Sequence, residues 1–285
     1  MRSFRLCALA CVSLAGTLPF FLVGHSQQPN ELPAATVYLG FDRNIYPGDE
    51  AIPVLRKTFS FTSFWLGAPP GEKRNSWQGK RELLASQGFG FVVLFKAMES
   101  RKLKSAFFAN HMGFFDADYA AKLARGEGFP DGTVIFLDIE EGGRLPTTYH
   151  EYVGSWIETL EAASFRAGVY CSAMPVDEGG GVSITTAQDL KNHLGARQLK
   201  YWVYNDACPP SPGCSFSLDA LPSAGSGFAN AIVCQYAQSP RRKEFTAHCP
   251  AKYAADGNCY APGDSAHKWF LDANVASSAD PSGGR

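Results

Sequence analysis

Residues 134–143 read VIFLDIEEGG. The first four are all apolar, as expected of a strand that is covered on both faces of a parallel sheet. Three carboxylates follow at once, because Asp138, Glu140 and Glu141 fall within four residues. A strand that is buried up to an acidic end is typical of parallel α/β folds, in which the carboxyl ends of the strands build the functional site.

Similar apolar runs recur along the chain and alternate with helical patterns. Strands are predicted over 37–42, 59–66, 89–95, 133–139, 167–172, 199–204, 231–236 and 268–273. Helices are predicted over 77–86, 116–125, 147–163 and 186–194, the second of them capped by Asp116. This alternation predicts an α/β fold, a single (β/α)8 TIM-like barrel. The alternative is an open doubly wound sheet, but the first strand leads into GFDRNIYPG, without the GxGxxG pattern of nucleotide-binding forms.

The start of the chain has the pattern of a secretory signal. Arg2 and Arg5 precede an apolar run over 6–23, and small residues stand before a predicted cleavage after Ser26. A membrane anchor is the alternative, although Pro19 makes the run a mediocre spanning helix. No later segment reaches the 18 or so apolar residues that a membrane span needs. We therefore expect a secreted or periplasmic protein, organised as signal peptide 1–26, N-terminal extension 27–36, barrel 37–276 and disordered tail 277–285.

Charge and cysteine content narrow the possible partners. Removing the two signal arginines from 26 basic residues leaves 24, against 27 acidic ones, which argues against a nucleic-acid partner. Six cysteines lie outside the signal, namely Cys171, Cys208, Cys214, Cys234, Cys249 and Cys259. Their even number in an exported chain suggests disulfides, with proximity favouring 208–214 and 249–259, while 171 and 234 are either paired or buried thiols. Without a CxxC pair or histidines at ligand spacing, we expect no metal and no other cofactor.

Acidic residues close three of the predicted strands. Asp42 ends the first, Asp138 and Glu140 end the fourth, and Asp272 ends the eighth. In a closed parallel barrel these ends converge at one mouth. Two carboxyl groups in a partly apolar cleft can be pushed to different pKa values, which is the requirement for glycoside hydrolysis. The alternative for each acid is a structural role, as a helix cap or an ion-pair partner.

These strand ends resemble a known family. The segments GFDRNIYPG, FLDIE, AGVYCS, YWVYN, CQYA and LDANVA resemble, in order, the strand-end signatures of family-25 glycoside hydrolases, the muramidase-type lysozymes. They are even more similar to a glycoside-hydrolase-like domain of the mycobacterial exported type. The similarity spans most of residues 37–276.

The resemblance implies roles for individual residues. Glu140 corresponds to the general acid, and Asp138 to the partner that stabilises the oxocarbenium-like state or orients a substrate acetamido group. The remaining positions are expected to line the cleft: Asp42, Asp272, Gln235, Tyr236, Tyr204, Asn274 and Lys96. Lys96 departs from the lysozyme pattern, and its ammonium would favour the ionised form of Glu140.

The sequence thus predicts a secreted glycoside hydrolase that acts on a polysaccharide of the peptidoglycan type. The alternative is a glycan-binding barrel that has lost the chemistry. A third class, an exported envelope-assembly protein, has only the signal in its favour. The geometry around Glu140 discriminates the first two: an ion pair that occupies it favours binding, and an open groove favours hydrolysis.

Overall fold

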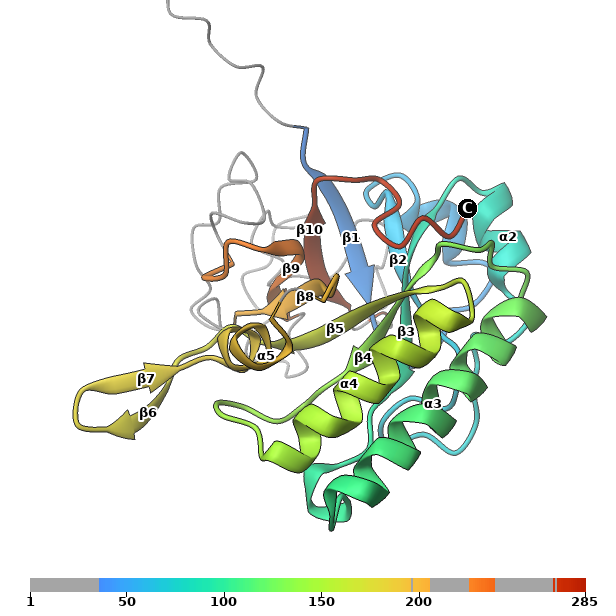
Figure 1. Ribbon diagram of the computed structural model, residues 1–285. Helices are drawn as coiled ribbons and strands as arrows, with labels where there is room; N and C mark the ends of the chain where they lie inside the picture. The colour runs from blue at the N-terminus through green and yellow to red at the C-terminus, as the bar shows by residue number, and fades with distance from the viewer. Residues whose placement is uncertain (1–35, 196, 206–225, 239–268, 270) are drawn as a thin grey trace, which may run out of the picture. The chain divides into compact units, whose positions relative to one another are not determined.

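Eight strands close into a barrel in the order β1-β10-β9-β8-β5-β4-β3-β2. The computed structural model describes residues 36–195, 197–205, 226–238, 269 and 271–285, shown in Figure 1. The barrel strands are β1 (Tyr38–Asp42), β2 (Phe61–Trp65), β3 (Gly90–Lys96), β4 (Val134–Asp138), β5 (Arg166–Ser172), β8 (Lys200–Tyr204), β9 (Ala231–Gln238) and β10 (Asp272–Ala276). Closure confirms the predicted barrel and excludes the open sheet.

One barrel strand runs against the others. Six strand pairs are parallel, whereas β10 pairs antiparallel with both β1 and β9. The prediction placed the last strand over 268–273 with Asp272 at its end, but the strand begins at Asp272 and continues to Ala276. Because its direction is reversed, its first residue lies at the end of the barrel where the parallel strands finish, and Asp272 pairs with Asp42.

Five α-helices and one 3₁₀ turn belong to the described part of the chain. They are α1 (Ile52–Leu55), α2 (Arg81–Ser86), η1 (Ser100–Lys102), α3 (Ala106–Gly126), α4 (Thr147–Ala162) and α5 (Thr186–Leu194). The prediction of Asp116 as an N-cap is wrong, since α3 begins ten residues earlier and is capped by Ser105, whose side chain accepts from the Phe108 amide. The aromatic residues in the first half of α3 point away from the core, so the usual inward apolar stripe is missing from the sequence there.

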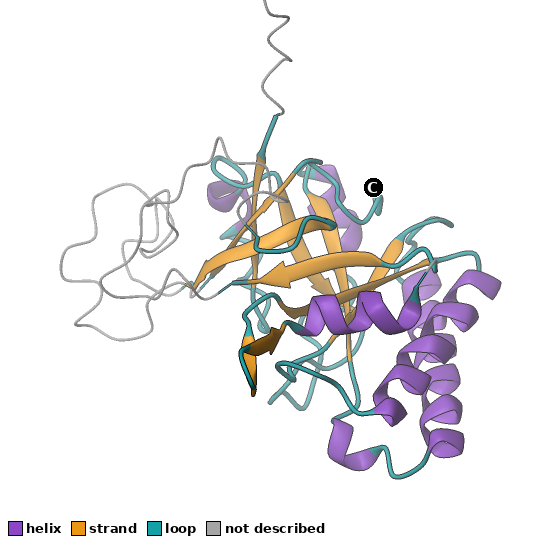
Figure 2. Ribbon diagram, turned by 60° about the vertical axis from the view of Figure 1, so that its left-hand side comes forward, coloured by secondary structure: helices purple, strands orange, loops and turns teal. Residues whose placement is uncertain are grey.

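The two longest helices, α3 and α4, lie side by side against the barrel (Figures 1 and 2). Small residues line the inward side of α3, and Gly113 marks the point of closest approach. A Cβ on Gly113 would come within 2.2 Å of the Tyr152 carbonyl oxygen of α4, so only glycine fits there. The inward side of α4 is large and apolar, with Tyr149, Trp156 and Leu160 fully buried.

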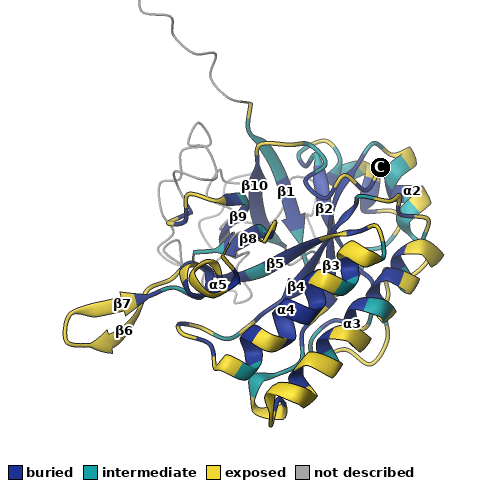
Figure 3. Cartoon of the chain, in the orientation of Figure 1, coloured by how far each residue is buried: buried dark blue, intermediate teal, exposed yellow. Residues whose placement is uncertain are grey.

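A two-stranded hairpin, β6 (Val176–Gly179) and β7 (Val182–Ile184), follows β5 and was not predicted. It projects from the barrel beside α5, and its residues are almost all exposed (Figure 3). An exposed hairpin without an apolar face carries no strong periodic signal, which explains the omission.

The predicted disorder of residues 277–285 is wrong. Ser282 is fully buried, its amide donates to the Phe91 carbonyl at 2.8 Å, and its hydroxyl accepts from the Val93 amide at 3.0 Å. Its carbonyl accepts from the Val134 amide at 2.8 Å. The segment therefore fills the space between the starts of β3 and β4. Its small polar residues suggested disorder, but they match the hydrogen-bonding groups that those strands leave open.

Several predictions lie wholly or partly outside the described residues. The signal peptide, most of the N-terminal extension and four cysteines (Cys208, Cys214, Cys249 and Cys259) remain predictions. Cys171 and Cys234 are both free and buried, and burial raises the pKa of each thiol. Among the helices that the structure describes, none is long and apolar enough to cross a membrane.

Candidate functional site at the barrel mouth

A cavity of about 240 Å³ opens at the carboxyl ends of the parallel strands. We call it the mouth cavity. Ten residues line it: Asp42, Asn44, Trp65, Leu94, Asp138, Glu140, Tyr170, Trp202, Gln235 and Asp272. Four carboxyl groups therefore meet at this cavity. Asp42 ends β1, Asp138 ends β4, Glu140 follows two residues later, and Asp272 begins β10.

Asp42 is held by two amide side chains. Gln235 Nε2 and Asn274 Nδ2 both donate to Asp42 Oδ2, at 2.8 and 2.6 Å. The amide orientations follow from their other partners, because Trp202 Nε1 donates to Asn274 Oδ1 at 2.8 Å and the Tyr170 hydroxyl donates to Gln235 Oε1 at 2.9 Å. The two N–H donors meet the same oxygen, so the network fixes the orientation of the Asp42 carboxyl group at the cavity.

Asp138 and Glu140 share the mouth cavity but differ in exposure. Asp138 is 5% exposed, and its Oδ2 is buried without a hydrogen-bond partner within the described structure. Glu140 is exposed. Burial, reinforced by the negative charge of Glu140, raises the pKa of Asp138 well above its usual range. Asp138 therefore retains its proton to higher pH than an isolated carboxyl would.

This distribution differs from the sequence expectation in one respect. The resemblance assigns the proton to Glu140, whereas burial places the raised pKa on Asp138. Exposure of the Glu140 side chain still makes it the member of the pair that reaches a bound molecule.

Tyr170 lies among all four carboxyl groups. Burial raises the pKa of its hydroxyl well above the ordinary value, and the charges of Asp42, Asp138, Glu140 and Asp272 act in the same direction. The hydroxyl therefore stays neutral and serves as a donor. Its ring packs edge-on against Trp202, with the centroids 4.8 Å apart, and the two rings contribute to the apolar lining of the cavity.

Two further cavities continue from the mouth cavity along the ends of β3 and β4. The side cavity, about 310 Å³, is lined by Pro70, Lys96, Ala97, Met98, Glu99, Asp138, Glu140 and Glu141. The outer cavity, also about 310 Å³, is lined by Gly67, Ala68, Phe95, Lys96, Ala97, Met98, Glu99, Lys102, Asp116 and Tyr119. Asp138 and Glu140 line the mouth and side cavities together, so the carboxyl pair stands at the boundary between them.

Lys96 pairs in register with Asp138 and lowers the pKa of that carboxyl, against the larger effect of burial. It lines the side and outer cavities and not the mouth cavity. Within the described part of the chain, no ion pair joins Lys96 or an arginine to Glu140. Glu141 is engaged elsewhere, since it accepts from the Ser100 amide at 2.6 Å.

Besides Lys96, three of the expected cleft residues do not line the mouth cavity. Asn274 is fully buried and positions Asp42 from behind. Tyr236 is buried against Cys234 and Val275 in a separate small cluster, because it alternates with the inward-pointing Gln235. Tyr204 lies beside Tyr170, with the ring centroids 5.4 Å apart, at the end of β8.

Five lining residues were not assigned to the site from the sequence, namely Asn44, Trp65, Leu94, Tyr170 and Trp202. Trp65, Tyr170 and Trp202 lie in predicted strands, where an aromatic residue can belong to the cleft or to the core. Asn44 follows the first strand by two residues and donates to the Pro70 carbonyl at 3.1 Å. A polar residue just beyond an acidic strand end was the signal that could have identified it.

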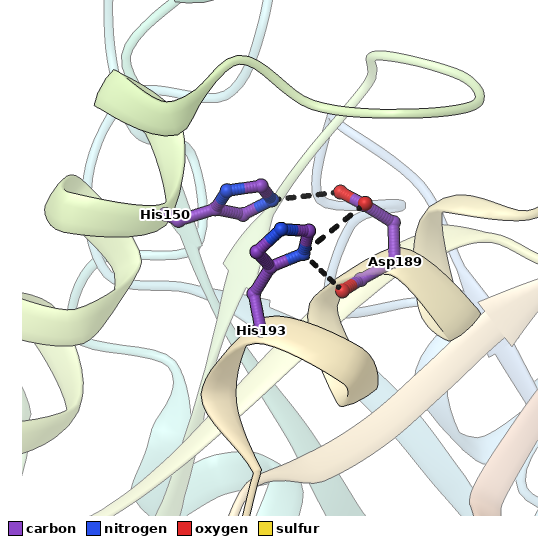
Figure 4. A group of neighbouring side chains, drawn as sticks. All are labelled: His150, Asp189 and His193. Atoms are coloured by element: carbon purple, nitrogen blue, oxygen red, sulfur yellow. Dashed lines mark hydrogen bonds and ion pairs between the residues drawn. The ribbon is translucent and has the colours of Figure 1, made fainter.

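A second group of titratable side chains lies away from the mouth (Figure 4). His150 Nε2 is 2.7 Å and His193 Nδ1 is 3.3 Å from the carboxylate of Asp189, which is fully buried. The three offer ligand atoms within 4.8 Å of one another. The imidazole rings are nearly parallel, 14° apart with centroids at 3.8 Å, so their in-plane lone pairs do not converge on one ion.

The surroundings of Asp189 suit a structural role. Its Oδ2 accepts from the Leu145 amide at 3.0 Å, and Arg144 Nη1 lies 3.6 Å from its Oδ1. The nearby Thr186 hydroxyl donates to the Glu141 carbonyl at 3.1 Å. The start of α5 thus holds the loop that follows Glu140. Spacing along the chain did not predict this cluster. Asp189 and His193 are four residues apart on α5, but His150 lies on α4.

Comparison with known proteins supports the resemblance. The model of the Rv2525c-like, glycoside hydrolase-like domain family matches residues 72–213, a stretch that contains Asp138 and Glu140. The family that the strand ends resemble is therefore confirmed for this stretch. No curated protein matches the chain.

Solved structures share the barrel. An uncharacterised protein of B. stearothermophilus is 17% identical, covers 84% of this chain and 95% of its own, and has a TM-score of 0.51. GHIP, a glycosyl hydrolase 25 of Streptococcus pneumoniae, is 11% identical over 84% and 86%, with a TM-score of 0.50. The Tat-secreted protein Rv2525c of Mycobacterium tuberculosis is 14% identical over 84% and 94%, with a TM-score of 0.48. At these identities the likeness concerns the fold.

Proposed function

We propose that this protein is an exported glycoside hydrolase that cleaves a cell-wall glycan of the peptidoglycan type at the barrel mouth. One observation carries the proposal. An exposed Glu140 stands at the boundary of two cavities, beside the buried Asp138, whose pKa is raised. Hydrolysis needs a carboxyl group that still holds a proton near neutral pH at the bond to be cleaved, with room for a sugar on each side.

The proposed reaction begins with proton transfer. The Asp138–Glu140 pair holds one proton, and Glu140 delivers it to the glycosidic oxygen, which leaves with the sugar in the side cavity. The bond between C1 and that oxygen breaks, and positive charge develops on the sugar ring in the mouth cavity. The carboxylate of Asp42, fixed by Gln235 and Asn274, stabilises this charge.

Water completes the reaction. Of the two roles that the resemblance leaves open for Asp138, the proposed reaction uses the orientation of a substrate acetamido group, whose oxygen first attacks C1 on the side opposite the leaving group. Water then opens the resulting ring, and its oxygen remains on C1. The second proton of that water returns to the carboxyl pair, which restores the starting state. No cofactor takes part.

The choice of substrate rests on the family. The model that matches residues 72–213 describes a glycoside hydrolase-like domain, and a structure of the same fold is named as a glycosyl hydrolase 25. Export is proposed from the signal pattern at residues 1–26. The open position of Glu140 favours hydrolysis over a barrel that only binds glycan.

The test is release of reducing ends from purified peptidoglycan by the wild type and by Glu140→Gln. General acid catalysis contributes about 10²–10⁴-fold, so the variant is expected to lose that factor while its circular dichroism spectrum stays unchanged. Glu161→Gln, a change at an exposed carboxylate near the end of α4, serves as the control and is expected to keep full activity. Absence of release by the wild type from peptidoglycan and from other polysaccharides, at every pH between 4 and 8, would refute the hydrolase.

A further inference from the structure

Helix α3 carries its large apolar residues on the outside. Five aromatic side chains are exposed there, with exposed fractions between 41% and 74%: Phe107, Phe108, Phe114, Phe115 and Tyr119. The buried side of the same helix consists of alanine and glycine. Figure 3 shows the exposed outer side of α3. We call these five residues the aromatic face.

The spacing of the five residues places them on one side of the helix. Phe108, Phe115 and Tyr119 are seven and four residues apart and form one row, whereas Phe107 and Phe114 form a second. The first row spans about 16 Å along the helix axis at 1.5 Å per residue. Exposed apolar groups in such number are typical of a surface that binds something.

The aromatic face is continuous with the proposed catalytic groove. Tyr119 lines the outer cavity, where its ring packs edge-on against Phe95 with the centroids 6.2 Å apart. The outer cavity shares Lys96 and Met98 with the side cavity. The side cavity ends at Asp138 and Glu140. A chain-like ligand can therefore pass from the carboxyl pair to α3 without leaving the lined surface.

Polar groups between the two aromatic rows identify the chemistry of the occupant. Asp118 and Lys122 form an ion pair of 2.6 Å there, and His111 lies against Phe107. A lipid surface would have to desolvate this ion pair, at a cost that neighbouring rings do not offset. A sugar presents apolar C–H faces and hydroxyl groups together, so rings and polar side chains both find partners.

We propose that the aromatic face is an extended binding surface for the glycan polymer whose cleavage site lies at Glu140. This inference rests on the proposed function and names its substrate as a long chain that extends beyond the catalytic groove. The polymer binds with sugar faces on Phe115 and Tyr119 and continues along α3 toward Phe108. Short oligosaccharides fill the mouth and side cavities alone and do not reach it.

Binding is tested with Phe108→Ser/Phe115→Ser in the Glu140→Gln background, so that cleavage does not interfere. Both phenylalanines are exposed, and their loss leaves the core intact. The probe is insoluble purified peptidoglycan, with bound protein measured by sedimentation. We expect affinity to fall on the order of tenfold, from the loss of two ring contacts. Val182→Ser, an equally exposed change on β7, is the matched control and is expected to bind like the parent.

Activity separates this inference from the proposed function. In the active protein, the double variant should lose about tenfold in kcat/KM on the insoluble polymer and keep its rate on a short soluble oligosaccharide. If the wild type cleaves neither substrate but the double variant binds the polymer more weakly, glycan binding by the aromatic face is supported and the proposed hydrolase activity is refuted. Equal polymer binding by the double variant and its parent overturns the inference.

Other occupants would give different results. Concentration-dependent dimerisation of the wild type that the double variant abolishes, or binding to anionic vesicles that it abolishes, would overturn the glycan assignment. Monomeric behaviour in sedimentation equilibrium and no vesicle binding, together with the loss on polymer, support it.

Discussion

The two ends of this barrel are built on opposite principles. At the mouth, four carboxyl groups converge, and one oxygen of Asp138 is buried without a hydrogen-bond partner in the described structure. At the other end, residues 277–285 close the starts of β3 and β4, and Ser282 satisfies Phe91, Val93 and Val134 with three hydrogen bonds. The closed end contributes stability, whereas the mouth keeps charges together at the expense of stability.

Packing sharpens the contrast. At the closed end, a Cβ on Gly90 would come within 2.0 Å of the Ala279 carbonyl oxygen, and one on Gly284 within 2.9 Å of the Phe129 ring. Arg81 also donates to the Gly284 carbonyl at 2.7 Å. At the mouth, three adjoining cavities are left open. Close packing indicates a fixed element, and buried charge beside open space indicates a site.

The largest expected effect is that of removing residues 279–285. The amides of Phe91, Val93 and Val134 lose their acceptors, and each orphaned buried amide costs about 1–3 kcal/mol. We expect the free energy of unfolding, measured with urea, to fall by several kcal/mol. Ser282→Ala is the milder test, with a loss of about 1–3 kcal/mol from the Val93 amide alone. Unchanged unfolding midpoints in both variants would mean that the segment does not close the barrel.

Asp138→Asn tests how much stability the buried carboxyl group at the mouth costs. In the unfolded chain this carboxyl ionises near 3.8, and in the fold only at higher pH, because burial raises its pKa. Its contribution to stability is full below about pH 4 and is lost as the pH rises toward the folded-state pKa, by about 1.4 kcal/mol for each pH unit. The asparagine variant does not titrate, so its stability should exceed that of the wild type by a margin that grows above pH 4.

Glu161→Gln provides the matched control for that pH series. Glu161 is exposed on α4 and is not among the charges that act on Asp138, so its replacement should shift the free energy of unfolding little at any pH between 4 and 8. A stability difference between Asp138→Asn and the wild type that stays flat across this range would contradict a raised pKa at Asp138.

The smallest effect is expected from Trp202→Phe. The ring is kept, but the Nε1 donor to Asn274 Oδ1 is lost, at a cost of about 1 kcal/mol. The Asn274 amide is then free to turn its oxygen toward Asp42, which would weaken the charge at the mouth. We expect a small drop in thermal stability and a larger drop in kcat than in KM. Asn274→Asp should reproduce the kinetic change. Wild-type kinetics in both variants would show that the hydrogen bonds from Trp202 to Asn274 and from Asn274 to Asp42 do not contribute to the mechanism.

Much of the fold was predictable because its signals are local. The apolar run over residues 134–137 predicted β4 within a residue, and the helix predicted over 186–194 is α5 with the same bounds. The direction of β10 was not predictable, since a strand of five residues carries no signal that distinguishes parallel from antiparallel pairing. Asp272 nevertheless lies at the mouth, as predicted. It begins β10 instead of ending it, but the strand also runs in the opposite direction, so the residue lies at the same end of the barrel.

The sequence by itself determined which residue types stand where strands end, and therefore that acids gather at one edge of an α/β barrel. Tertiary structure decided which acid is buried and which is exposed, and how each is oriented. Asp42 is fixed by Gln235 and Asn274, which are 193 and 232 residues away along the chain. A pKa depends on burial and on neighbouring charges in space, and neither can be read from spacing along a chain. The same holds for α3, whose outward rings only the packing against α4 reveals.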